Sequence, residues 1–144
     1  LGTIIKTAGS QARFFEIDHD IPLAIAKLAQ AQGCKKMILV SSVGADSGSR
    51  IFYSRVKGQL EDDLSKLGFE ELHILRPSML LGDRSEQRAG ESLGKLMMKP
   101  LMPLIPWKYK PIHAETLAAT ILHLAHHSKA GIHIHEGQAL FLPK

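Results

Sequence analysis

A tyrosine and a lysine four positions apart form the strongest candidate for a catalytic pair in this sequence. They close the stretch VSSVGADSGSRIFYSRVK, and on a helix Tyr53 and Lys57 would lie on one face. An ammonium group near a phenol favours the phenolate and lowers the pKa of a tyrosine from its usual value of roughly 10. Such a phenol exchanges a proton more readily near neutral pH. The pair predicts an acid–base centre, with two solvated side chains on an ordinary helix as the alternative.

Two serines upstream of this pair favour the first interpretation. Ser41 and Ser42 follow an apolar run over 37–40, which reads as a buried strand. The carboxyl ends of parallel strands are where open α/β sheets bind ligands, so a serine hydroxyl there could donate a hydrogen bond to a substrate oxygen. Gly44 and Ala45 leave the chain room to turn. It is this context, more than the tyrosine and lysine alone, that predicts a site.

Helical and strand patterns alternate along the chain, which is typical of an α/β fold with a mostly parallel sheet. The first predicted helix, over 21–32, would have Asp18 or Asp20 near its start and Pro22 in its first turn, and Gly33 would stop it. The closely spaced Pro100, Pro103 and Pro106 predict an irregular segment. The other predicted elements are helices over 51–67, 91–98 and 115–127, strands over 37–40 and 71–75, and short strand candidates at 132–135 and 139–142.

The composition is that of an ordinary soluble globular protein, with 44% apolar and 22% charged residues in a chain of 144, a length that fits one domain. The net charge of +4 is spread along the chain, so we expect no nucleic-acid partner. No apolar run approaches the roughly 18 residues that a membrane span needs, and the first residues lack the pattern of a secretory signal. With a single cysteine, these features predict a cytoplasmic protein without a membrane partner.

Three stretches of the chain, LVSSVGAD, YSRVKGQLED and LHILRPSMLLGDR, resemble the second half of the short-chain dehydrogenase/reductase superfamily. More narrowly, they are similar to an atypical branch of NAD(P)H-binding oxidoreductases related to the human Tat-interacting protein. The opening residues and the later KPIHAETLAATIL also match that branch. The resemblance implies the C-terminal portion of a doubly wound, Rossmann-type parallel sheet. It also implies a single domain over 1–144, with a small substrate-covering region at about 84–112.

The resemblance implies a role for each matching residue. Tyr53 matches the acid/base that protonates a carbonyl as hydride arrives, and Lys57 matches the residue that assists it and binds the nicotinamide ribose. Ser41 matches the serine that orients the carbonyl, because twelve positions separate it from Tyr53, and Ser42 is the alternative. Further cofactor contacts are implied at Gly2, Thr3, Pro77, Ser78, Met79, Leu80 and Arg88, with Arg84 the less favoured basic position.

One departure from the family pattern concerns the cofactor. The glycine motif G-x-x-G-x-x-G of its first strand–helix unit does not occur in this sequence, nor do the residues that distinguish NADP from NAD. We expect about three strands of the family's fold to be absent with it, and residues 1–144 alone to bind a dinucleotide weakly. We still expect an oxidoreductase that uses NADP, slightly preferred, or NAD, and acts on a small carbonyl or alcohol. A non-catalytic dinucleotide-binding regulatory or interaction protein is the main alternative, and a related epimerase or dehydratase is the next.

Eight histidines raise the question of a metal site. His123, His126 and His127 have helical spacing, and His133 and His135 would share one face of a strand. Zinc needs three or four convergent ligands with supporting contacts, so a histidine-rich exposed surface is the simpler interpretation, and we expect no metal. For His113 and Cys34 we expect structural roles.

Overall fold

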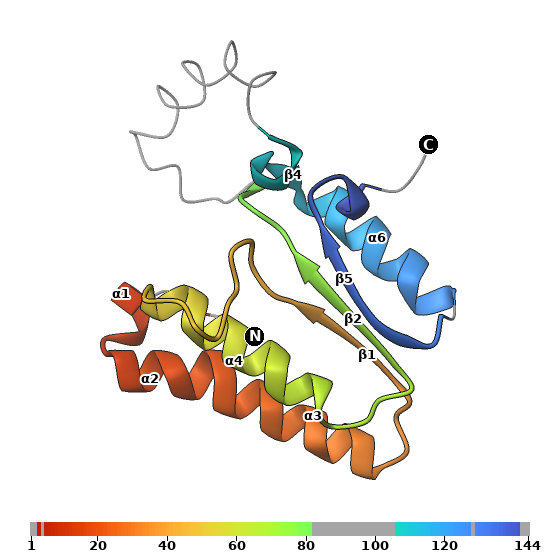
Figure 1. Ribbon diagram of the computed structural model, residues 1–144, viewed down its shortest axis with the longest axis horizontal. Helices are drawn as coiled ribbons and strands as arrows, with labels where there is room; N and C mark the ends of the chain where they lie inside the picture. The colour runs from red at the N-terminus through yellow and green to blue at the C-terminus, as the bar shows by residue number, and fades with distance from the viewer. Residues whose placement is uncertain (1–2, 4, 82–105, 128, 142–144) are drawn as a thin grey trace.

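A three-stranded parallel sheet between two layers of helices forms the centre of the computed structural model, which describes residues 3, 5–81, 106–127 and 129–141 (Figure 1). The strands are β1 (Lys36–Val40), β2 (Glu71–Arg76) and β5 (Gly131–Glu136), and they lie in the order β1-β2-β5. This arrangement confirms the predicted α/β class with a parallel sheet and is consistent with a Rossmann-like fold. The carboxyl ends of all three strands lie at the same edge, because the strands are parallel.

One face of the sheet packs against helices α3 (Ile21–Ala31) and α4 (Phe52–Ser65). The buried side chains of this layer are Ala26, Leu39, Leu60, Leu64, Phe69, Leu72 and Ile74. Successive strand residues point to opposite faces, so Leu72 and Ile74 face α4 while Leu75 faces the other way. The predicted helix over 51–67 is thus confirmed, and its inner face is what holds it on the sheet.

The opposite face is covered by α6 (Ala114–His126), as Figure 1 shows. Its core consists of Leu75, Ile112, Leu117 and Leu140. Lys36 extends its ammonium group from β1 to the C-terminal end of α6, where it donates to the carbonyl oxygens of Leu124, at 2.9 Å, and His127, at 3.1 Å. A cation at that end satisfies carbonyl groups that have no partner within the helix.

The first long helix begins ten residues earlier than the sequence predicts. It runs without a break through α2 (Gln11–Phe15), a π-helical turn η1 (Glu16–Asp20) and α3. Ser10 caps it by accepting the Arg13 N–H at 3.1 Å. α3 confirms the predicted helix over 21–32, but Asp20 makes no capping hydrogen bond before it, because the helical backbone continues upstream. Pro22 has no N–H to donate, and the wider π-helical turn lies directly before it.

Three further differences concern short elements. The predicted strand at 139–142 is wrong, because Gly137, with φ of 59°, opens a 3₁₀ turn η4 (Gly137–Leu140) that places Leu140 in the core. Two short strands, β3 (Leu80–Leu81) and β4 (Ile112–His113), pair in parallel and were not predicted. The remaining short elements are α1 (Ile5–Ala8) and η3 (Trp107–Tyr109).

The predicted helix over 91–98 and most of the predicted substrate-covering region lie outside the described residues. Within the part that is described, no helix has both the length and the apolar character needed to cross a lipid bilayer.

Candidate functional site

Tyr53 and Lys57 share one face of α4 at the carboxyl edge of the sheet. The Lys57 ammonium lies 5.9 Å from the centre of the Tyr53 ring, and the centre of the Phe14 ring lies 5.8 Å from that of Tyr53. The two residues differ in exposure, at 36% for Tyr53 and 8% for Lys57. The tyrosine is therefore accessible to a ligand, whereas the lysine acts from within the protein.

A buried carboxylate holds the lysine in place. Asp18 accepts a hydrogen bond from the Lys57 ammonium at 2.6 Å, and its second oxygen accepts the backbone N–H of Thr3 at 2.9 Å. Asp18 is only 1% exposed, and a buried ammonium of this kind requires a counter-charge. No motif marks Asp18 as a site residue. The π-helical turn before Pro22 carries it, and the sequence offers only a Pro after a D-x-D stretch as a signal.

A cavity of about 270 Å³ lies beside this ion pair. Asp18 and Lys57 form its polar wall, and apolar side chains of α3, α4 and β1 form the rest. In the described part of the chain β1 pairs with β2 alone, so the cavity opens along the outer edge of the sheet. Among the described residues, Asp18 and Lys57 are the only charged ones that line this cavity.

The hydroxyl of Ser41 is held by a second buried carboxylate. Ser41 donates to Oε1 of Glu61, a residue of α4 that is 4% exposed, and Arg76 at the end of β2 donates from Nε to both oxygens at 3.1 Å. The hydrogen bond to Glu61 is the main cause that raises the pKa of the Arg76 guanidinium. Ser42, the alternative, instead donates to the neighbouring Val43 carbonyl at 3.4 Å.

The segments after β1 and β2 are tied together next to these residues. The Val43 N–H donates to the carbonyl of Pro77 at 2.9 Å, and the Ser78 hydroxyl donates to the Lys110 carbonyl. The Met79 carbonyl accepts the N–H of Ile112 at 2.9 Å. Met79 and Leu80 expose their side chains. Pro77 to Leu80 thus lie at the edge predicted for cofactor contacts, and their contact with a cofactor stays a prediction.

The structure brings some of the predicted site residues together and not others. Tyr53, Lys57 and Thr3 meet around Asp18 and Phe14, and Ser41 meets Glu61. Among the described contacts, none joins Ser41 to Tyr53 directly. Gly2, Arg84 and Arg88 lie outside the described residues.

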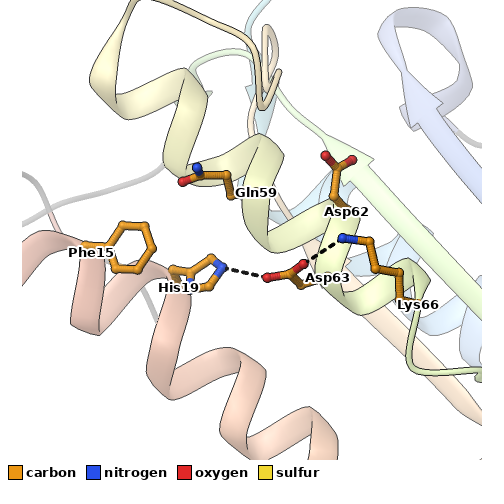
Figure 2. A pocket seen from close by; sticks show the side chains of 6 residues that line it. All are labelled: Phe15, His19, Gln59, Asp62, Asp63 and Lys66. Atoms are coloured by element: carbon orange, nitrogen blue, oxygen red, sulfur yellow. Dashed lines mark hydrogen bonds and ion pairs between the residues drawn. The ribbon is translucent and has the colours of Figure 1, made fainter.

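Figure 2 shows a second cavity, of about 260 Å³, between η1 and α4. The His19 ring stacks on Phe15 with 4.5 Å between ring centres, and its Nε2 lies 3.2 Å from a carboxylate oxygen of Asp63. Lys66 donates to the other oxygen of Asp63 at 3.0 Å. The polar groups of His19, Asp63 and Lys66 bind one another across the cavity. We therefore interpret them as a connection between η1 and α4 and not as a ligand site.

The histidines of β2 and β5 form a hydrogen-bonded chain beneath α6. His73 lies between Glu71, 2.7 Å from its Nε2, and His135, 2.8 Å from its Nδ1. Burial favours the neutral form of Glu71, but hydrogen bonds from His73, the Lys129 backbone and Lys36 outweigh it and lower the pKa of this carboxyl to about 2. Among the described residues, no three His, Cys, Asp or Glu side chains converge to hold a metal ion.

Comparison with known proteins places the chain in a family. The family profile described as HIM1 matches residues 1–110, which is more than half of the chain. The chain belongs to the HIM1 family. Among the relatives of this HIM1-family protein, the mitochondrial protein FMP52 of Candida glabrata is 44% identical over 90 residues, which are 62% of this chain and 39% of FMP52. The Saccharomyces cerevisiae protein of that name is 40% identical over 96 residues, 67% of this chain and 42% of the relative.

Rat protein HTATIP2 is a further relative, 44% identical over 95 residues, 66% of this chain and 39% of HTATIP2. The chain thus spans about two fifths of the length of the curated relatives it matches. The HTATIP2 match confirms the predicted relation to the Tat-interacting group at the level of the family. Membership of the short-chain dehydrogenase/reductase superfamily stays a prediction.

The predicted cytoplasmic location is wrong by the same comparison. The FMP52 relatives from Candida glabrata, Emericella nidulans, Eremothecium gossypii and Saccharomyces cerevisiae are all named mitochondrial, which points to mitochondria. The prediction rested on a single cysteine and on the absence of a secretory pattern. Both features argue only against a secreted protein. They do not distinguish the cytosol from an organelle such as the mitochondrion.

Proposed function

We propose that this HIM1-family protein is an NAD(P)H-dependent oxidoreductase of the short-chain dehydrogenase type that moves hydride to or from a carbonyl or alcohol. The position of the Lys57 ammonium carries the proposal. It lies 5.9 Å from the centre of the Tyr53 ring and also on the wall of the cavity beside β1. A tyrosine that exchanges protons needs a nearby cation to favour its phenolate, and α4 supplies one from the next turn.

The residues around Lys57 suit the ribose next to a nicotinamide. A lysine ammonium has three N–H donors, of which Asp18 takes one, so the others can bind sugar hydroxyls. The segment Pro77 to Leu80, at the carboxyl end of β2, supports the proposal as the wall that a nicotinamide would contact. The sequence contains no glycine motif that would bind the phosphates. These residues therefore suit only the nicotinamide and its ribose, and not the rest of NADP or NAD.

The bound cofactor would supply hydride to the carbonyl carbon or accept it from an alcohol carbon. In the direction of reduction, Tyr53 gives its phenolic proton to the carbonyl oxygen, and in oxidation its phenolate takes the hydroxyl proton. Lys57 stabilises the phenolate that the reduction leaves behind. Asp18 keeps the ammonium next to Tyr53, since moving it away would strand a buried carboxylate.

A non-catalytic dinucleotide-binding protein is the second candidate, and one observation favours it. Ser41 donates its hydroxyl proton to Glu61, and no described contact links it to Tyr53. A binding module would need Lys57 and the cavity, and it would not need Ser41 and Tyr53 to act on one substrate atom.

The variant Tyr53→Phe separates the two candidates. NADPH and NADH are titrated by fluorescence, and turnover is measured with a panel of aldehydes and ketones. For an oxidoreductase, we expect Tyr53→Phe to keep cofactor binding and to lose about 100-fold or more in turnover, and Lys57→Met to weaken both. Lys66→Met, a change at an exposed lysine directly after the same helix, is the control. Turnover that survives Tyr53→Phe contradicts the oxidoreductase, and binding without turnover in the unchanged protein supports the second candidate.

A further inference from the structure

A chain of hydrogen bonds between β2 and β5 takes no part in the proposed reaction. His73, only 1% exposed, lies between Glu71 of its own strand and His135 of β5. Glu71, with a pKa of about 2, is ionised at neutral pH and can only accept, so Nε2 of His73 carries a proton and donates to it. Nδ1 of His73 faces Nε2 of His135 at 2.8 Å, and a single proton must lie between these two nitrogens.

This arrangement limits the number of protons that the two imidazole rings can hold. With one added proton, either ring can carry the charge, and one of the facing nitrogens still donates to the other. With two added protons, all four ring nitrogens carry hydrogen, and the two nitrogens that face each other at 2.8 Å are both donors. The hydrogen bond is then replaced by repulsion between two imidazolium cations, one of them buried.

Further basic groups surround the pair. The ring of His133, from the same strand as His135, has its centre 5.1 Å from that of His73. Burial, followed by the charges of neighbouring basic groups, lowers the pKa of His135 from its usual value of 6.5. These groups are His73, His133 and Lys129. Below pH 6.5 an opened chain therefore takes up a proton that the folded strand resists, and opening becomes easier as the pH falls.

Glu71 is the anion that compensates these charges, and it is already shared. Lys36 of β1 lies 3.1 Å from the same carboxylate oxygen to which His73 donates. Among the described residues of α6, which covers this face of the sheet, none forms an ion pair or hydrogen bond with the two rings. One carboxylate that also pairs with Lys36 cannot balance two added protons.

β5 is the strand that such repulsion would release. In the described part of the chain it pairs with β2 alone. Ile132 and Ile134 lie on the face opposite the histidines of β5, and they are 51% and 52% exposed. Apolar burial thus holds β5 mainly from one side, and an element with few buried apolar contacts is one that opens locally at low cost.

We propose that the His73–His135 hydrogen bond is a pH-sensitive switch that holds β5 on β2 at neutral pH and lets the strand open in weak acid. The switch needs neither cofactor nor substrate, so it is independent of the oxidoreductase function. Opening would also break the contact at the end of β5, where Glu136 pairs with Lys108 of η3 at 3.2 Å. The histidines of β2 and β5 thereby acquire a role that requires no metal.

Amide hydrogen exchange tests the switch when it is followed by NMR from about pH 7.5 to about pH 5 and corrected for intrinsic exchange. We expect protection factors in β5 to fall by about tenfold or more over this range, while those in β1 and α4 change by less than about threefold. His135→Gln should abolish the fall, because a glutamine amide can donate to Nδ1 of His73 but takes up no proton. His113→Gln, at an exposed histidine outside the cluster, is the matched control and should keep the fall.

Three results overturn the proposal: protection of β5 that does not depend on pH, a fall of equal size in every element, or the same fall in His135→Gln. A second measurement needs no variant. Proton–nitrogen NMR of the imidazole rings at neutral pH should show His73 with a proton on Nε2 and none on Nδ1. A proton on Nδ1 alone would mean that the hydrogen bond to Glu71 does not form, and the proposal would fail on that result too.

Discussion

Lys57 and Asp18, which are 39 positions apart in the sequence, form a buried ion pair of 2.6 Å between α4 and the π-helical turn η1. The pair joins a lysine that a motif identifies to an aspartate that no motif identifies. The pair also fixes the position of the Lys57 ammonium next to Tyr53. Among the described residues, this is the only cation that contacts the Tyr53 ring.

The first prediction concerns the ion pair itself. Asp18→Asn leaves the buried Lys57 ammonium without a counter-charge, and we expect a loss of about 3–5 kcal/mol in the free energy of unfolding, measured with urea. Adding Lys57→Met should recover most of the loss, because an apolar side chain strands no charge. The control Asp62→Asn changes an exposed residue of α4 and should stay within about 0.5 kcal/mol. Losses that simply add in the double variant would contradict the pair.

A second prediction concerns Gly58, where the loop after β1 approaches α4. A Cβ atom at this position would lie 2.2 Å from the backbone nitrogen of Ser47 and 2.3 Å from the carbonyl carbon of Asp46. Gly58→Ala should therefore destabilise the protein by about 1–3 kcal/mol, although alanine is the better helix former by about 1 kcal/mol. Asp62→Ala in the same helix is the control for propensity without a clash. A more stable Gly58→Ala variant in urea unfolding would mean that the loop does not pack there.

The third prediction tests where the first long helix begins. Ser10→Ala removes the hydroxyl that accepts the Arg13 N–H, and we expect a loss of about 1 kcal/mol in the free energy of unfolding. Ser10→Asp should retain the cap, because its side chain can accept the same N–H. If the helix began near Asp20 instead, Ser10→Ala would have no effect on the thermal midpoint.

A fourth prediction follows from the pKa of Glu71, which is lowered from 4.5 to about 2 in the folded protein. Between pH 4.5 and about pH 2, Glu71 is protonated in the unfolded chain but ionised in the folded protein. The free energy of unfolding therefore decreases as the pH falls through this range. The contribution of Glu71 is complete above pH 4.5 and is lost toward pH 2.

The measurement for this prediction is the urea midpoint as a function of pH. Glu71→Gln should flatten the acid limb of that curve, whereas Glu70→Gln, at the exposed neighbouring residue, should leave its shape unchanged. The same acid limb in Glu71→Gln and in the unchanged protein would show that other carboxyl groups control acid unfolding.

Elements with a local residue pattern could be predicted from the amino-acid sequence. The apolar run over 37–40 and the periodicities of α4 and α6 are each set by neighbouring residues, and all three formed where predicted. The same holds for the placement of Tyr53 and Lys57 on one face, because i and i+4 meet on any helix. A cap at Ser10 was equally local and could have been found from Ser10 and the helical residues after it.

The contacts of the site residues, in contrast, depend on how the helices and strands pack. Asp18 meets Lys57 through the packing of η1 on α4, and Glu61 meets Ser41 and Arg76 because α4 crosses the ends of two parallel strands. Sequence spacing gives no distance between residues on different elements, so neither partner could be predicted. The spacing of Tyr53 and Lys57 in the sequence thus predicts the candidate acid–base pair. The packing of α4 determines which charged and hydrogen-bonding groups surround it.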